Sequence, residues 1–471
     1  MRILGLSFGF HDAGACMLQD TTIEFAGHSE RYSKVKNDAW INHELIGAAI
    51  EGGKPDVIVL HEKAWLKKLR NVYGRNWSAL REPTQKQWIK KFYPELKDIP
   101  IKQYLHHETH AAAGVLSSDF DECAVMVIDA IGEFDTASIW QWKEGKLKKL
   151  HSVKFPSSLG LFYSAVTHHV GLKPMEDEYI LMGMAAYGKS ENWKPVSKKM
   201  GKRFFHHKHP WISHRQSILT KENLQRGLPK GSFVGVDDFD MAAAAQDQVE
   251  QRVSAYAEYA KEITGSSNLV YMGGVALNCV ANSMLTDIFK NIFIMPNPGD
   301  CGSALGAAAL ELYNTSGDRV KWETPYLGYN IEGKYPVKKA LKSLKEGELF
   351  GIANGRAEYG PRALGNRSLC ADPRGTEVKD KMNVIKKRQM FRPFAPMILE
   401  EHVHDYFEMP GGISHAPYMQ FVAKCKKPDE FPAIIHEDGT SRVQTVRKTE
   451  HPDLHNLLTK FYEETGCPML L

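Results

Sequence analysis

Two short windows of this sequence share one pattern, and that pattern restricts the fold more than any other feature. The apolar segment 3–8 is followed by a glycine and by residues 11–16, which run into a second apolar segment. The segment 123–132 repeats this order, with residues 134–139 in the second place. Short apolar runs bounded by turn residues are typical of buried strands. The sequence therefore predicts two α/β lobes that arose by duplication.

The remaining elements of the first 310 residues fit such lobes. Residues 56–62 (DVIVLHE) form an apolar run typical of a buried strand, and residues 101–116 change from a strand pattern to a helical one. Residues 238–264 have the pattern of a long helix. Strand, turn and helix then recur at 268–285 and again at 292–310. This alternation of strands and helices predicts an α/β fold class.

Composition narrows the class of protein further. A chain of 471 residues should form two or three domains at about 150 residues each. The formal charge of +4 is too small to indicate nucleic acid or an anionic membrane as a partner. The seven cysteines are scattered and form no CxxC pair, which is typical of a reducing compartment. Apolar runs are too short to span a bilayer, and the amino terminus is unlike a signal peptide. We expect a soluble, cytoplasmic protein.

A boundary between domains is expected near residue 325. Residues 314–336 are rich in Pro, Gly and polar residues, and the chain beyond them is more basic. We therefore predict one domain over 1–325 and a second over 326–471. Within the first domain, residues 189–235 are basic and irregular, and we expect a solvated surface insertion there rather than a lid over a site.

Four residues have the types and positions of metal ligands. His106 and His110 are four residues apart at a predicted helix start, so both rings lie on one helix face. Asp129 follows a strand, and Asp300 lies just before a helix. Strand ends converge where ligands bind in such folds, and two His with two Asp suit iron(II), manganese or zinc. The alternative is a surface His pair, a helix-capping Asp and an ordinary strand-end Asp. Spacing alone favours neither.

Two further features of the first domain are compatible with nucleotide chemistry. The motif GGVALN contains Gly273, Gly274 and Asn278 at a strand-turn-helix, where backbone can approach a phosphate. The alternative is close helix packing. His11 follows the first strand and would lie near the same cleft, where a neutral imidazole can accept a proton. A lone histidine is more often structural, so this pattern is not specific by itself.

The second domain contains a dense group of cations between 355 and 396. Arginines fixed by Gly-Pro turns suit bidentate binding of phosphate, and a solvated helix face would intersperse more acidic residues. RNA binding is the competing interpretation, but the cations are local and the chain is nearly neutral. The residues that we expect to bind phosphate groups are Arg356, Arg362, Lys386, Arg388 and Arg392.

Taken together, the motifs of this chain resemble those of the O-carbamoyltransferase family of the NodU/CmcH/TobZ type. The matching segments occur in family order from residue 9 to about residue 396, with further similarity in TGCPMLL. They are FHDAGACML, SERYSKVKND, HHETHAAAG, VIDAIGE, MGMAAYG, GGVALN, NPGDCGSALGAA, GRAEYGPRALGNRSLCADPR and FRPFAP.

This resemblance implies both a fold and a reaction. The first domain would be a duplicated domain of the actin/Hsp70-like type, and the second a smaller YrdC-like α+β domain. The second domain would form carbamoyl adenylate and pyrophosphate from carbamoyl phosphate and ATP, with Mg²⁺ accompanying the ATP. The first would transfer the carbamoyl group to a hydroxyl of a small molecule and release AMP.

The resemblance also implies roles for the residues named above. His106, His110, Asp129 and Asp300 would bind a metal, with Fe²⁺ expected and another divalent metal as the alternative. Gly273, Gly274 and Asn278 would contact the adenylate. His11 would deprotonate the acceptor. The cations Arg356, Arg362, Lys386, Arg388 and Arg392 would bind carbamoyl phosphate and ATP.

The end of the chain departs from the family pattern. Family members continue beyond TGCPMLL, so we expect a C-terminally shortened YrdC-like domain. Three explanations then stay open: the chain is a fragment, a second polypeptide completes the domain, or adenylate formation is impaired. Two other functions stay open: a relative that carbamoylates or threonylcarbamoylates tRNA, and a non-catalytic nucleotide- and metal-binding half of a split assembly. Family likeness suggests a monomer or homodimer, and the acceptor leaves no readable motif.

Overall fold

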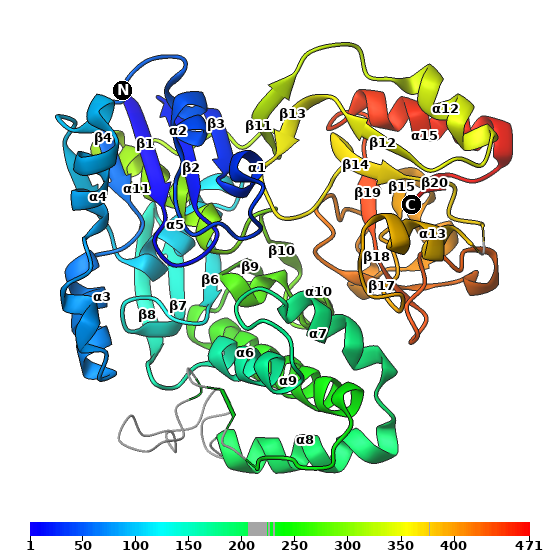
Figure 1. Ribbon diagram of the computed structural model, residues 1–471, viewed down its shortest axis with the longest axis horizontal. Coiled ribbons are helices and arrows are strands. Elements are labelled where there is room, and N and C mark those ends of the chain that lie inside the picture. The colour runs from blue at the N-terminus through cyan, green and yellow to red at the C-terminus, as the bar shows by residue number, and fades with distance from the viewer. Residues whose placement is uncertain (206–223, 225–226, 229–230, 376) are drawn as a thin grey trace. The chain divides into compact units, whose positions relative to one another are not determined.

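A computed structural model describes residues 1–205, 224, 227–228, 231–375 and 377–471, which form two compact units (Figure 1). Unit 1 consists of residues 1–277 and 288–323, and unit 2 consists of residues 278–287 and 324–471. The predicted boundary after residue 325 would place residues 278–287 in the first domain. In the structure these residues belong to unit 2.

The first sheet of unit 1 has five strands in the order β3-β2-β1-β4-β5. Neighbours β1/β2 and β2/β3 are antiparallel, whereas β1/β4 and β4/β5 are parallel. Apolar side chains of β1, β2 and β4 are buried, which explains why these short runs form strands. The strands are β1 (Arg2–Ser7), β2 (Gly14–Gln19), β3 (Thr22–His28), β4 (Val57–Leu60) and β5 (Ile101–Gln103).

The second sheet of unit 1 repeats this topology. Its order is β10-β9-β6-β7-β8, with antiparallel β6/β7 and β7/β8 and parallel β6/β9 and β9/β10. These matching strand orders confirm the α/β fold class and the two predicted lobes of similar topology. The strands are β6 (Cys123–Ile128), β7 (Asp135–Lys143), β8 (Lys146–Lys154), β9 (Asn268–Met272) and β10 (Asn291–Phe293).

Two helices with small residues pack closely between the sheets and determine where the candidate ligands lie. The helices are α5 (His106–Ser117) and α11 (Ser303–Ser316). Gly306 of α11 lies so close to α5 that an added Cβ would be 1.9 Å from the Thr109 carbonyl oxygen. Gly5 of β1 has the same distance to the Ala304 carbonyl oxygen. The contact of α11 with α5 and its contact with β1 therefore each require a glycine.

The other described helices of unit 1 cover the sheets or extend from them. They are α1 (Glu30–Ser33), α2 (His43–Ile50), α3 (Ala64–Tyr73), α4 (Gln85–Phe92), α6 (Leu159–His169), α7 (Glu178–Met184), α8 (Ser190–Phe204) and α9 (Asp238–Thr264). The long helix predicted at 238–264 is confirmed, with Asp237 at its N-cap and Gly265 in the left-handed conformation after its end.

One part of the segment expected to be irregular is helical. Residues 190–204 of the predicted irregular stretch 189–235 form α8, although Pro195 lies within it. The buried side chains of Met200 and Phe204 explain the helix, because they give it an apolar face. Much of the remaining stretch, residues 206–223, 225–226 and 229–230, lies outside the described residues.

Unit 2 is built from small sheets and short helices. Its sheets have the orders β11-β13, β12-β14, β19-β15-β20 and β16-β17-β18. The strands are β11 (Tyr326–Ile331), β12 (Phe350–Ala353), β13 (Gly355–Glu358), β14 (Arg367–Cys370), β15 (Met397–Leu399), β16 (Phe407–Glu408), β17 (Val422–Cys425), β18 (Thr440–Arg442), β19 (Gln444–Val446) and β20 (Met469–Leu470). The helices are α10 (Cys279–Met284), α12 (Val337–Lys345), α13 (Val378–Ile385), α14 (Val403–Tyr406) and α15 (Pro452–Thr465).

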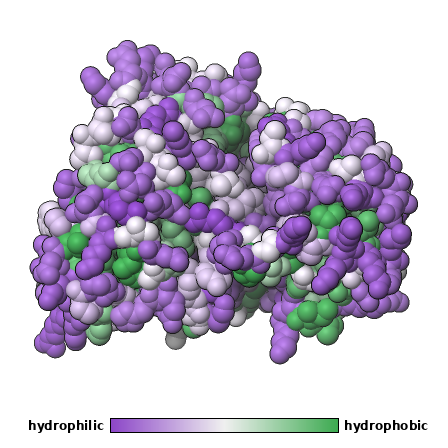
Figure 2. All heavy atoms as spheres, turned by 90° about the horizontal axis from the view of Figure 1, so that it is seen from above, coloured by the Kyte–Doolittle hydropathy of each residue, from purple (hydrophilic) through white to green (hydrophobic). Residues whose placement is uncertain are grey.

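Among the described residues, no helix is both long and apolar enough to cross a membrane. The face drawn in Figure 2 is mostly hydrophilic, with separate hydrophobic patches.

Candidate metal centre and active site

The start of α5 places two histidine side chains next to each other. His106 and His110 are one helical turn apart, and both are buried. The backbone N–H of His106 donates to both carboxylate oxygens of Glu133, each at 3.1 Å. Glu133 Oε1 also accepts from the backbone N–H of Lys63 at 2.8 Å. Glu133 thus satisfies the first N–H of the helix that carries both imidazoles, and it also accepts from the N-cap residue of α3.

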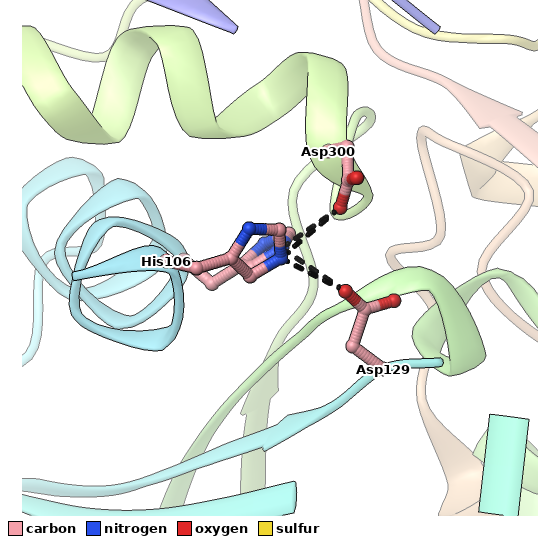
Figure 3. A group of neighbouring side chains, drawn as sticks. His106, Asp129 and Asp300 are labelled. Atoms are coloured by element: carbon pink, nitrogen blue, oxygen red, sulfur yellow. Dashed lines mark hydrogen bonds and ion pairs between the residues drawn. The ribbon is translucent and has the colours of Figure 1, made fainter. Parts of the chain in front are cut away.

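Two carboxylates reach the same point from the other direction (Figure 3). Asp129 directly follows β6, and the backbone N–H of Gly274 donates to its Oδ1 at 3.2 Å. Asp300 begins a short 3₁₀ helix directly before α11. Figure 3 shows both carboxylates pointing toward the imidazole of His106. The close packing of α11 on α5 brings Asp300 to this position.

Four ligating atoms converge in this cluster. His106 Nε2 is 3.0 Å from Asp129 Oδ2, 3.3 Å from Asp300 Oδ1 and 3.2 Å from His110 Nε2. His110 Nε2 is 3.3 Å from Asp300 Oδ1 and 3.7 Å from Asp129 Oδ2. All four atoms lie within 4.8 Å of one another, and all four side chains are buried. The structure thus brings together the four residues that the sequence predicted as metal ligands.

Charge inside the cluster is balanced between the rings and the carboxylates. Burial opposes protonation of His106, but the carboxylates of Asp300 and Asp129 outweigh it and raise the pKa of His106. Burial and the charge of Asp300 would raise the pKa of Asp129, but hydrogen bonds from His106 and His110 lower it. The pKa of Asp300 is also lowered, against burial, by the charges of His106 and His11. Both carboxylates are therefore ionised, and positive charge must accompany them.

The donor set suits a divalent cation. The two Nε2 atoms face each other at 3.2 Å, so one hydrogen at most fits between them. Both rings also direct these atoms at ionised carboxylates. A cation satisfies all four atoms together, and two imidazole nitrogens with two carboxylate oxygens are ligands for iron(II), manganese or zinc. Within the described part of the chain, Nδ1 of His106 and of His110 is buried without a hydrogen-bond partner.

His11 lies at the edge of this cluster. Its Nε2 is 3.7 Å from Asp300 Oδ2, and about a quarter of its side chain is exposed. Its loop is held along residues 37–39 by backbone hydrogen bonds from Gly9 to Ala39 and from Asp12 to Asn37. His11 therefore has both access to solvent and proximity to the candidate metal ligands.

Two residues of this region were missed in the sequence. Glu133 accepts hydrogen bonds at the start of α5, and its only sequence signal is its place directly after the strand and turn of VIDAIGE. His61 is buried with its ring centroid 5.3 Å from that of His106, and burial lowers its pKa to about 4. His61 directly follows β4, a strand-end position like that of Asp129, and this position is the signal that could have identified it.

The glycines of GGVALN have local structural roles. Gly273 has a φ of +93°, and a Cβ there would be 2.2 Å from the Ile128 carbonyl oxygen. A Cβ on Gly274 would be 2.9 Å from Asp129 Oδ1. These glycines therefore allow the turn after β9 to hold Asp129. Asn278 is the N-cap of α10, accepting from the Ala281 N–H at 3.1 Å. Their predicted contact with a nucleotide stays a prediction.

Two of the predicted phosphate-binding arginines are tied to backbone carbonyls of unit 2. Arg356 donates from Nη2 to the Leu327 carbonyl oxygen at 2.6 Å and from Nε to that of Gly328 at 3.2 Å. Arg362 is buried and donates from Nη1 to the Tyr418 carbonyl oxygen at 2.9 Å. Burial and the nearby Arg442 lower the pKa of Arg362 to about 9. Arg442 was not among the predicted phosphate-binding cations, since no motif surrounds it.

The other three predicted cations form a group of like charges. Burial, Arg388 and Arg392 together lower the pKa of Lys386. Arg388 donates from Nη2 to the Pro393 carbonyl oxygen at 3.0 Å, and its guanidinium lies 4.0 Å from the ring centroid of Phe394. Because like charges repel, such a group is suited to an anion. Their role in binding carbamoyl phosphate and ATP stays a prediction.

Comparison with known proteins assigns the chain to a family. The sequence model described as the carbamoyltransferase N-terminus matches residues 59–309, and that of the carbamoyltransferase C-terminus matches residues 341–471. The chain therefore belongs to the carbamoyltransferase family, a family of enzymes. This confirms the family resemblance found in the sequence.

Named relatives agree with this assignment. Nodulation protein NolO of Bradyrhizobium diazoefficiens is 32% identical over 396 residues, covering 78% of this chain and 71% of the relative. The 3'-hydroxymethylcephem-O-carbamoyltransferase of Amycolatopsis lactamdurans is 28% identical over 497 residues, covering 98% of this chain and 90% of the relative. A crystal structure of HypF from T. kodakarensis matches over 67% of this chain and 48% of the HypF chain, with 12% identity and a TM-score of 0.38. At that score the likeness carries no argument about this chain.

Proposed function

We propose that this protein is an ATP-dependent O-carbamoyltransferase that acts on a hydroxyl of a small molecule. The observation that carries the proposal is the convergence of His106, His110, Asp129 and Asp300 beside His11 in a member of the carbamoyltransferase family. A metal-binding cluster next to a partly exposed imidazole provides both charge stabilisation and a base, which transfer of an acyl group to an alcohol requires.

Unit 2 would activate the carbamoyl group. Carbamoyl phosphate, ATP and water would give carbamoyl adenylate, pyrophosphate and phosphate. Activation is needed because the carbamoyl group is resonance-stabilised, and AMP is a better leaving group than an unactivated oxygen. The group of Lys386, Arg388 and Arg392 supports this assignment, because its like charges favour binding of the phosphate oxygens. We propose that unit 2 is a YrdC-like domain on the basis of the family resemblance.

Unit 1 would perform the transfer. We propose an actin/Hsp70-like domain, which the repeated strand order of its two sheets supports. His11 would accept the proton of the acceptor hydroxyl as its oxygen forms a bond to the carbamoyl carbon. The bond from that carbon to the oxygen of AMP would break, and AMP would leave. A base within hydrogen-bond reach is needed because an alcohol is a poor nucleophile at neutral pH.

The four-residue cluster would hold a divalent cation, which we expect to be iron(II). When bound, the cation would supply Lewis-acid stabilisation of negative charge that develops on the carbamoyl oxygen. Glu133 would keep the start of α5 in place, and Gly274 would orient Asp129 through its backbone N–H. These two contacts support the ligand geometry without touching the substrate.

The experiment that tests the function is a measurement of pyrophosphate and phosphate release by the purified 471-residue chain. ATP and carbamoyl phosphate are supplied together, and each is then omitted in turn. We expect pyrophosphate only when both are present. Pyrophosphate release from ATP without carbamoyl phosphate would contradict the proposal, and so would the absence of release from a chain that binds both compounds.

A further inference from the structure

Helix α3 has its apolar side turned away from the protein. Trp65, Leu69 and Tyr73 are four residues apart in succession, so they form one stripe along the helix. Their exposed fractions are 62%, 52% and 56%. The buried positions of the helix are instead Ala64 and Arg70, and Arg70 donates from Nη1 to the Gly132 carbonyl oxygen at 2.8 Å. A helix on a protein surface normally buries its apolar side chains against the core and exposes its charged ones.

The next turn of the chain extends this apolar stripe. Residues 77–80 form a 3₁₀ helix in which Trp77 and Leu80 are exposed, at 65% and 54%. The Lys68 ammonium donates to the carbonyl oxygen of Leu80 at 3.2 Å, which connects this turn to α3. Five large apolar side chains are thus exposed within 16 residues. A patch of exposed apolar side chains of this size marks a surface that binds a protein or a membrane.

The same segment is strongly basic. Residues 63–92 contain nine Lys and Arg but one acidic residue, in a chain whose total charge is only +4. Arg75 and Arg81 lie next to the apolar stripe in sequence, and Lys86, Lys90 and Lys91 follow on α4; all five are exposed. Figure 1 shows α3 and α4 at the edge of unit 1. An occupant that is both apolar and negatively charged therefore complements this segment.

We propose that this face, formed by α3, residues 77–80 and α4, binds the surface of an anionic lipid bilayer. Trp, Tyr and Leu on one helix face with surrounding Lys and Arg is the pattern of a helix lying in the interface of a membrane. Each basic residue near an anionic leaflet adds to the binding. A second copy of this chain is disfavoured as the occupant, because a symmetric contact would bring two strongly basic faces together. Leu69 and Leu80 disfavour nucleic acid, which offers no apolar phase for them.

The test is co-sedimentation of the full chain with phospholipid vesicles. One set contains phosphatidylcholine alone, and the other contains phosphatidylcholine with 30% phosphatidylglycerol. We expect binding to the anionic vesicles in 0.1 M salt and at least about tenfold weaker binding in 0.5 M salt or to neutral vesicles. Failure to bind anionic vesicles at low salt would overturn the proposal.

Variants then locate the binding surface. The triple variant Trp65→Ser, Leu69→Ser, Tyr73→Ser should weaken binding at least about tenfold. Its control is Val234→Ser with Tyr329→Ser, which replaces exposed apolar residues elsewhere and should bind as the native chain does. Circular dichroism checks that both variants are folded. A separate variant, Lys86→Gln, Lys90→Gln, Lys91→Gln, should lose most of the salt dependence without altering the apolar stripe.

Two results with these variants would overturn the assignment. One is equal vesicle binding by the triple variant and its control. The other is a dimer of the native chain, measured by light scattering, that the triple variant converts to monomer, because a second copy would then cover the stripe.

Discussion

Gly306 of α11 offers a direct perturbation of the candidate metal centre without changing any ligand. A Cβ at this position would be 1.9 Å from the Thr109 carbonyl oxygen and 2.9 Å from the Ala113 Cβ. Thr109 lies between His106 and His110 on α5, and α11 follows Asp300 directly. Gly306→Ala therefore pushes apart the two helices that hold the imidazoles and the Asp300 carboxylate.

The structure gives the size of this effect. An ordinary contact with Cβ begins near 3.4 Å, so the two backbones must separate locally by about 1.5 Å. Overpacking of this kind costs about 3 kcal/mol, and the higher helix propensity of alanine offsets about 1 kcal/mol. We expect the free energy of unfolding to fall by about 2 kcal/mol. Because the 3.3 Å separation of His110 Nε2 and Asp300 Oδ1 would widen, metal affinity should fall about tenfold or more.

The assays are urea unfolding and titration of the metal-free protein with Co²⁺ or Zn²⁺ by calorimetry. Gly47→Ala is the matched control, since Gly47 lies within α2, is exposed and has no atom within 4 Å of an added Cβ. It should raise stability by about 0.5–1 kcal/mol and leave metal affinity unchanged. If Gly306→Ala behaves like Gly47→Ala in both assays, the helix-packing argument is refuted.

Three other predictions concern the two units separately. Arg388→Ala should raise the carbamoyl phosphate concentration needed for pyrophosphate release, with partial recovery in Arg388→Lys; an unchanged dependence in the alanine variant would remove Arg388 from the site. His11→Ala should reduce carbamoyl transfer by about 10²–10⁴-fold and leave pyrophosphate release intact, whereas unchanged transfer would make His11 structural. Burial lowers the pKa of His415, but hydrogen bonds to Glu400 and Glu450 outweigh it and raise the pKa to about 9. The contribution of His415 to the free energy of unfolding is therefore complete below pH 6.5 and is lost as the pH rises through 9. With about a third of the ring exposed, this loss is about 1 kcal/mol. His415→Gln should remove this slope from the pH dependence of unfolding, and an unchanged slope would assign it to other groups.

Much of unit 1 could be predicted from sequence because its signals are local. The strands β4 and β6 are fully buried and contain no polar residue, and between its polar ends β1 is also apolar and buried, so little obscures the pattern. Helix α9 has an N-cap at Asp237 and ends before Gly265, and both boundaries were therefore readable. Helix α8 was missed because Pro195 and its many basic residues conceal the few positions that pack.

The candidate site was readable where its residues follow the ends of regular elements. His106 and His110 are one turn apart at a helix start, and Asp129 follows a strand, so periodicity places all three. Glu133 contributes through hydrogen bonds to backbone N–H groups 27 and 70 residues away, and such contacts leave no periodic trace. The packing of Gly306 on Thr109 is equally invisible, because a small residue in a helix is compatible with many neighbours.

Metal content and carbamoyl transfer in His110→Ala test the central claim most directly. Mass spectrometry measures the metal that is bound after purification and after loading with Fe²⁺ under anaerobic conditions. A single turnover with supplied carbamoyl adenylate measures transfer. We predict that the native chain holds one metal per molecule and that His110→Ala has neither metal nor transfer, while pyrophosphate release is retained. Full metal content together with native transfer in His110→Ala would contradict the assignment of this cluster as the metal centre.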